Sequence, residues 1–156
     1  MKTWNELAIS IHADNVAAGW WTDPKTGADL HETRDRLNLS MLVITELTEA
    51  ADAYYHDAMD DKLPQYKGVG VELADAQIGI LDRLGADIKP VPTGDFEYAP
   101  DRYRHFNRLL PITGFGTQLA NMVMYVSLAA ESDRQTLISY AGGAITPCLD
   151  YIHCLG

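Results

Sequence analysis

The chain has 156 residues, of which 47% are hydrophobic and 22% charged, and its formal net charge at pH 7 is −10. This length suits a single domain over residues 1–156, and the composition excludes a disordered chain, a collagen-like repeat and a disulfide scaffold. The acidic charge, with no clustered basic segment, argues against a nucleic-acid partner, and no apolar run approaches the roughly 18 residues of a membrane span.

The cysteines and the N-terminus bear on the compartment. Cys148 and Cys154 lie outside any C-x-x-C motif, so we expect buried free thiols rather than redox or metal-binding groups. The N-terminus has no charged segment leading into an apolar signal core. We therefore expect a cytoplasmic protein with no membrane partner.

Apolar residues recur at helical spacing from the start of the chain. Residues 3–18 fit one helix, and residues 20–27 contain the proline and glycine of a loop. Asp29 and Glu32 have the spacing of a capping box. They predict the start of a long second helix that continues to about residue 54.

The middle of the chain alternates between breakers and helical pattern. Residues 60–70 hold a proline and two glycines and are predicted to form a loop, after which residues 71–84 form a third helix. Residues 86–111 contain four prolines, which predicts a crossover loop with a short helix near residues 103–109.

Two further helices are expected in the last third. Residues 115–130 repeat as a fourth helix, and Ser132 with Gln135 forms a capping box for a fifth, which Pro147 should kink or interrupt. No segment shows a convincing strand alternation. The sequence predicts an all-α bundle of about five helices with a four-helix core.

An acidic residue occupies the apolar stripe of the second helix. At about 100° per residue, Glu46 falls in the middle of this stripe and Glu49 at its edge. The stripe consists of Leu39, Leu42, Val43, Ala50 and Ala53. An ionised carboxylate facing a core is costly unless it is paired or coordinates a metal, so Glu46 requires a partner.

The third helix carries its own acidic line, formed by Glu72, Asp75 and Asp82. A solvated acidic face is the plain alternative for this line taken alone. If the two helices face each other, however, each contributes two carboxylates to one groove. Oxygen ligands suit Mg²⁺ or Mn²⁺ rather than zinc. A di-iron carboxylate bundle is excluded, because it uses Glu-x-x-His pairs and no glutamate of this chain is followed by histidine three residues later.

These residues resemble a known signature. Glu46-x-x-Glu49, then 22 residues, then Glu72-x-x-Asp75 is similar to the E-x-x-E…E-x-x-D motif of the all-α nucleotide pyrophosphohydrolases, the MazG-like and dimeric dUTPase group. The segments GWW (19–21), ITELTEA (44–50) and VELADA (71–76) occur in the order found in its short MazG-like members. The resemblance covers roughly residues 8–88.

The resemblance implies a Mg²⁺-dependent enzyme, with Mn²⁺ as the second choice of metal. It would cleave a nucleoside or deoxynucleoside triphosphate between the α and β phosphates and release the monophosphate and pyrophosphate. The implied metal ligands are Glu46, Glu49, Glu72 and Asp75, with Glu46 or Glu49 as general base, and nearby Asp82 could help to hold a second ion. Relatives form dimers or tetramers, so a homodimer or homotetramer is expected.

Substrate contacts are expected from two further sets of residues. The candidates for base recognition are His12, Asn15, Trp20 and Trp21, and those for the phosphates are Arg36, Lys67 and Arg83. For each there is a plain alternative, a residue that caps the core or a surface cation that aids solubility.

Two other functions stay open. The chain could be a noncatalytic acidic helical module that binds a partner or a regulatory nucleotide, although such a module has no need to bury Glu46. It could also hydrolyse another phosphorylated nucleotide metabolite, such as a phosphoribosyl nucleotide.

Overall fold

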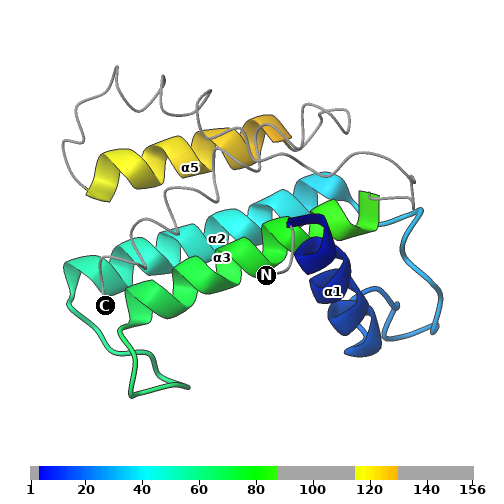
Figure 1. Ribbon diagram of the computed structural model, residues 1–156, viewed down its shortest axis with the longest axis horizontal. Coiled ribbons are helices and arrows are strands. Elements are labelled where there is room, and N and C mark those ends of the chain that lie inside the picture. Colours follow the sequence, from blue (N-terminus) through cyan, green and yellow to red (C-terminus); the bar gives the residue numbers. More distant parts are fainter. Residues whose placement is uncertain (1–3, 88–114, 130–156) are drawn as a thin grey trace.

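The computed structural model describes residues 4–87 and 115–129, and this part of the chain contains α-helices and no strand (Figure 1). The helices are α1 (Trp4–Ala17), α2 (Arg36–Tyr55), α3 (Gly68–Asp87) and α5 (Phe115–Ala129). The predicted all-α fold is confirmed. The short helix expected near 103–109, the fifth helix from Ser132 with Pro147, and both cysteines lie outside the described residues.

Helix α1 ends where the sequence predicts. Gly19 follows it with a φ of +87°, a left-handed conformation that glycine adopts without steric penalty. The backbone N–H groups of Gly19 and Trp20 donate to the carbonyl groups of Val16 and Asn15, at 3.0 Å in each case. This turn redirects the chain into the loop that leads to α2.

Helix α2 begins at Arg36, four residues after the end of the proposed capping box at Glu32. Its N-cap is Asp35, whose carboxylate accepts hydrogen bonds from the backbone N–H groups of Leu37 and Asn38. The capping box of Asp29 and Glu32 is wrong, because Asp29 pairs with Thr22 in an isolated β-bridge and its carboxylate accepts from the His31 backbone N–H. The chain at Asp29 is therefore extended rather than helical.

Helix α3 begins earlier than predicted, because Gly68 and Gly70 belong to it rather than to the preceding loop. A Cβ on Gly68 would lie 3.0 Å from Ala53 Cβ and 3.4 Å from the carbonyl oxygen of Ala58. The missing side chain lets the start of α3 approach the end of α2 closely. This glycine serves packing rather than a turn.

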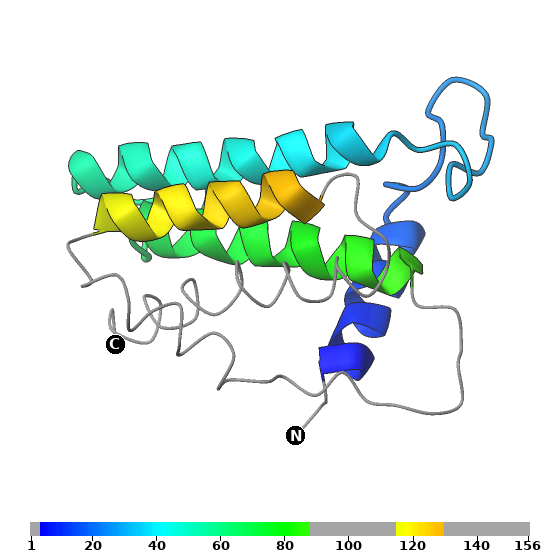
Figure 2. The ribbon, with the colours of Figure 1, turned by 90° about the horizontal axis from the view of Figure 1, so that it is seen from above.

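The four described helices share one core. Helices α2 and α3 run antiparallel and side by side, α1 crosses α3 near its C-terminal end, and α5 runs along α2 (Figures 1 and 2). The buried side chains that join them include Ala8, Val43, Leu47, Ala50, Leu73, Ala76, Leu84 and Met122. Leu42, expected in the core stripe, is 42% exposed. Within the described ranges, no helix combines the length and apolar character required to cross a membrane.

Candidate metal centre

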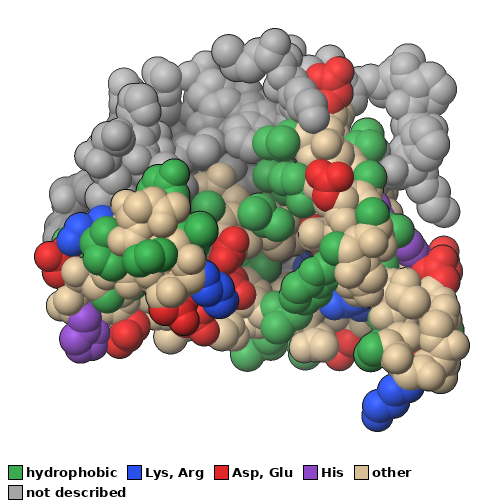
Figure 3. All heavy atoms as spheres, turned by 90° about the horizontal axis from the view of Figure 1, so that it is seen from below, with side chains coloured by type: hydrophobic (Ala, Val, Ile, Leu, Met, Phe, Trp, Pro, Cys, Tyr) green, Lys and Arg blue, Asp and Glu red, His purple; other side chains and the backbone are tan. Residues whose placement is uncertain are grey.

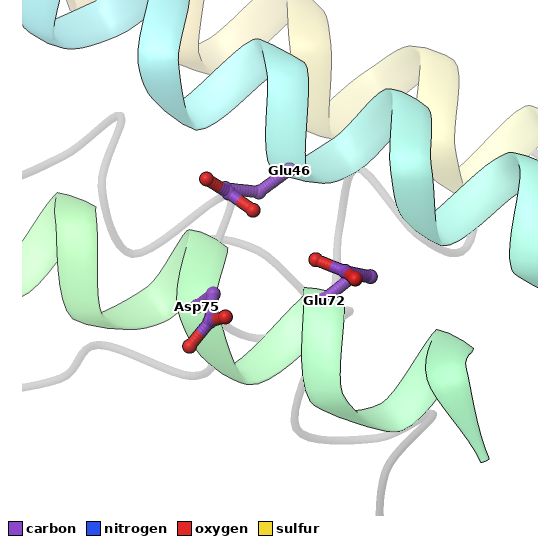
Figure 4. A group of neighbouring side chains, drawn as sticks. All are labelled: Glu46, Glu72 and Asp75. Atoms are coloured by element: carbon purple, nitrogen blue, oxygen red, sulfur yellow. The ribbon is translucent and has the colours of Figure 1, made fainter. Parts of the chain in front are cut away.

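Helices α2 and α3 bring three carboxylates together. Glu46 projects from α2 toward Glu72 and Asp75, which lie one turn apart on the facing side of α3 (Figure 4). One carboxylate oxygen from each residue lies within 4.8 Å of the others. The spacing of three residues on α3 and the antiparallel packing of the two helices produce this cluster.

The three carboxyl groups of the cluster all have raised pKa values, so each loses its proton less readily than an ordinary carboxyl group. Burial raises the pKa of Glu72 to about 7, together with a hydrogen bond that its protonated carboxyl donates to Glu46 and the charges of Glu49, Glu46 and Asp75. Burial also raises the pKa of Glu46, opposed by the hydrogen bond to Glu72 and by Lys62. The pKa of Asp75 is raised by burial as well, again opposed by Lys62. A divalent cation would relieve this repulsion.

Glu49 stands slightly apart from the other three. It is exposed and lies outside the group whose oxygens converge, but it lines the same pocket. Its charge contributes to the raised pKa values of Glu46, Glu72 and Asp75. All four motif residues therefore line one pocket. Glu46, Glu72 and Asp75 form the converging group, and Glu49 lies beside it.

The pocket has a volume of about 550 Å³ and extends along α3. Glu72, Asp75, Gly79 and Asp82 line it at helical spacing, a distance of about 15 Å at 1.5 Å per residue. Acidic side chains gather beside basic ones on the face drawn in Figure 3. The size suits a small-molecule ligand, for which pockets of about 300–1,000 Å³ are usual.

Two of the cations proposed for phosphate binding do not line this pocket. Arg36 lies 3.3 Å from the carboxylate of Asp87, where α2 begins beside the end of α3. Lys67 pairs with Asp57 at 2.6 Å in the segment between α2 and α3. Proximity in sequence to the acidic motifs did not bring them to the cluster.

The third proposed cation, Arg83, is buried instead. Its Nη1 donates to Ser40 Oγ at 2.9 Å, and burial lowers the pKa of its guanidinium. The cations that line the pocket are Lys62 and Arg34, which the sequence did not indicate. Lys62 lies between the two halves of the motif, which was the available signal, whereas the place of Arg34 depends on how its loop folds.

The residues proposed for base recognition divide into two pairs. Asn15 and Trp20 line the pocket at the end away from the carboxylate cluster. His12 and Trp21 lie behind it and hold Asp82: the Trp21 indole N–H donates to both carboxylate oxygens at 3.0 and 3.1 Å, and His12 Nδ1 lies 2.7 Å from Oδ1. The carboxylate of Asp82 is thus bound by His12 and Trp21, and it does not belong to the converging group of Glu46, Glu72 and Asp75.

The donor set indicates which ion fits. The converging atoms of Glu46, Glu72 and Asp75 are all carboxylate oxygens, the ligands that hard cations such as Mg²⁺ and Mn²⁺ prefer. Burial and mutual repulsion raise their pKa values, and Lys62 offsets only part of this effect for Glu46 and Asp75. Comparison with protein-family models, curated proteins and solved structures finds no match to the chain, so its function has to be inferred from these residues.

Proposed function

We propose that the chain is a Mg²⁺-dependent nucleotide pyrophosphohydrolase that cleaves a nucleoside or deoxynucleoside triphosphate between the α and β phosphates. The observation that carries the proposal is the convergence of Glu46, Glu72 and Asp75 within 4.8 Å on the wall of a pocket of about 550 Å³. The similarity of the two acidic motifs to those of the MazG-like group supplies the substrate class.

The four motif carboxylates have distinct tasks in this proposal. Glu46, Glu72 and Asp75 hold Mg²⁺, and Glu49 completes the acidic wall. Bound Mg²⁺ would neutralise phosphate oxygens and lower the pKa of a water molecule. A bound cation would reduce the repulsion between the carboxylates, and this reduction favours binding.

Glu49 is the better candidate for the general base. Glu46 shares a hydrogen bond with Glu72 and belongs to the converging group, whereas Glu49 is exposed and lies beside it. Glu49 accepts the proton of the attacking water. A bond forms between the water oxygen and phosphorus, the bond from that phosphorus to the α–β bridging oxygen breaks, and pyrophosphate leaves the nucleoside monophosphate.

The remaining lining suits the two ends of a nucleotide. Lys62, near the carboxylates, offsets the charge of the phosphates. At the other end, the Trp20 indole offers a stacking face and the Asn15 amide offers a donor and an acceptor for a base. Arg34, whose guanidinium donates to the carbonyl oxygen of Trp20, fixes this end of the pocket.

The test is pyrophosphate release from all canonical ribo- and deoxynucleoside triphosphates, with Mg²⁺ and with chelator. We expect release from at least one substrate, dependent on Mg²⁺. Glu49→Gln and Asp75→Asn should each lower turnover by about two orders of magnitude or more with helical content unchanged. Glu32→Gln, which alters an exposed glutamate outside the pocket, is the control and should match the wild type.

Other outcomes separate the alternatives. Release of inorganic phosphate, or turnover only of other phosphorylated nucleotides, would move the chain to a different class of phosphohydrolase. Nucleotide binding without turnover would identify a binding module. Wild-type turnover in both acidic-site variants would count decisively against the carboxylate cluster as the site.

A further inference from the structure

Two histidines meet outside the carboxylate cluster. His12 lies on α1, and His31 lies in the loop that returns from α1 to α2. Their Nε2 atoms are 3.1 Å apart, with the ring centroids 5.1 Å apart and the ring planes almost perpendicular at 88°. The contact joins two segments separated by 19 residues.

A carboxylate holds the other nitrogen of each ring. His12 Nδ1 lies 2.7 Å from Asp82 Oδ1, and His31 Nδ1 contacts Asp29 Oδ1. Because an ionised carboxylate only accepts hydrogen bonds, each Nδ1 carries a hydrogen, which leaves Nε2 as the ring atom available to bind a proton or a metal ion. Two such nitrogens 3.1 Å apart are joined either by a proton on one ring, which gives an N–H···N hydrogen bond, or by a metal ion that both nitrogens bind.

Packing fixes both rings in this arrangement. The His31 ring stacks on Trp21, with centroids 4.9 Å apart and planes 24° apart, and the His12 ring meets Trp21 edge-on at 4.8 Å. The His12 side chain is 14% exposed and that of His31 is 35% exposed. The pair is therefore oriented by the fold and accessible from solvent on the His31 side.

We propose that His12 and His31 bind one transition-metal ion of the zinc type through their Nε2 atoms. An ion about 2.0–2.1 Å from both nitrogens would account for the observed 3.1 Å with an angle of about 100° at the metal, somewhat below the tetrahedral angle. Hydrogen bonds from the second ring nitrogen to carboxylates are the usual support of a metal-binding histidine. Imidazole ligands select zinc, copper or nickel, so this site differs from the oxygen-only cluster.

The ion would link α1 to the loop between α1 and α2. That loop supplies Trp20 and Arg34 to the pocket, and the Arg34 guanidinium lies 5.2 Å above the Trp21 ring. Because Trp21 also packs against both histidines, a metal at this position would order the pocket end away from the carboxylates. Zinc should therefore raise thermal stability as well as bind.

The experiment titrates the full chain, freed of metal and then saturated with Mg²⁺ to occupy the carboxylates, with Zn²⁺ by calorimetry. The variant is His31→Gln, because His31 lies in an exposed loop where the substitution should leave the fold intact. The matched control is His56→Gln, since His56 Nδ1 also faces a carboxylate, that of Asp52, at 3.2 Å. Other zinc-binding groups are the same in all three proteins, so the differences report on this pair.

We expect His31→Gln to weaken Zn²⁺ binding at least tenfold and to remove the zinc-induced rise in melting temperature, whereas His56→Gln behaves as the wild type. In ¹⁵N spectra of the wild type, Zn²⁺ should shift the Nε2 resonances of both histidines. Equal Zn²⁺ binding by the wild type and His31→Gln would overturn the proposal. So would Nε2 resonances that respond to pH but not to Zn²⁺, since the pair would then share a proton.

Discussion

Glu72 is the carboxyl group of the pocket whose pKa is raised furthest. Its pKa of about 7 results from burial, from the hydrogen bond that it donates to Glu46, and from the charges of the surrounding carboxylates. Near neutral pH, without a cation, a substantial fraction of the molecules therefore keep a proton on this carboxyl. A metal that uses Glu72 as a ligand must displace that proton, so metal affinity should rise with pH.

The raised pKa makes the metal-free protein less stable as pH rises. The folded-state pKa of Glu72, about 7, exceeds the ordinary value of 4.5, so the folded state binds the proton more tightly than the unfolded chain. Its contribution to stability is fully present below about pH 4.5 and is lost as pH rises to about 7. Melts in chelator should fall more steeply across this window for the wild type than for Glu72→Gln. Parallel curves would show that Glu72 titrates normally.

Glu46, on α2, takes part in the same repulsion between the carboxylates of the pocket. Replacing it by Gln removes one charge at nearly constant shape, and should raise metal-free stability near neutral pH while weakening metal binding. Melts of both proteins, each in chelator and in excess Mg²⁺, should show a smaller Mg²⁺-induced shift in the variant. Glu32→Gln provides the control and should shift as the wild type does. An equal shift in Glu46→Gln would mean that Glu46 is not a ligand.

Helical periodicity explains which site residues could be predicted from the sequence. Glu46, Glu72 and Asp75 were indicated because their positions on regular helices follow from residue number alone. Lys62 and Arg34 were not indicated, because both lie on loops whose paths depend on tertiary packing. Function at this pocket combines the two kinds of residue.

At the scale of the helices, the presence of each described helix could be predicted from the sequence, but the first residues of α2 and α3 could not. The apolar spacing of α1, α2, α3 and α5 identified all four. The start of α2 at Asp35 was missed because Asp29, which has a plausible capping sequence, is held extended by its bridge to Thr22. The start of α3 was missed because Gly68 resembles a loop residue, although it serves close packing against Ala53.

Gly85 is the point at which α1 and α3 approach most closely among the glycines of α3. A Cβ there would overlap the Ala8 carbonyl oxygen and lie 2.5 Å from His12 Cβ, so Gly85→Ala should destabilise the protein by about 1–3 kcal/mol. In the control, Gly116→Ala, the added methyl would lie 3.0 Å from the Tyr55 hydroxyl and, within the described part of the chain, would meet no other atom closely. Because that exposed ring can move, the variant should be neutral or gain up to about 1 kcal/mol of helix propensity. Urea denaturation of both measures the difference, and equal stabilities would mean that α1 yields at the contact.

At the scale of the whole molecule, docking of α1 on α3 creates contacts that helical spacing cannot reveal. His12 and Asp82 are 70 residues apart, yet His12 Nδ1 lies 2.7 Å from the carboxylate, with Trp21 bound to the same group. Helical spacing does not pair these residues, because their contact depends on the crossing of two helices. Asp82 was consequently expected beside the metal rather than in this network.

The described surface also carries apolar side chains that the monomer leaves exposed. On α5, which has no charged residue, Met124 is 41% and Leu128 48% exposed, one turn apart on one face. On α2, Leu37 and Met41 are more than half exposed at the same spacing. Exposed apolar side chains that share a helix face are often found at interaction sites.

We expect these faces to bury one another in a homodimer or homotetramer, since removal of apolar area from water favours association. Light scattering at micromolar concentration should give a mass above that of the 17.3 kDa chain. Leu128→Glu, which places a charge on the α5 face, should shift the mass toward the monomer as the protein is diluted. Lys25→Glu introduces the same residue into an exposed loop and should leave the assembly intact, which separates a local effect at α5 from a general effect of added negative charge. A strictly monomeric wild type would show that the exposed apolar side chains have another role. If both variants dissociate alike, the added negative charge, rather than the loss of apolar contact at α5, is responsible.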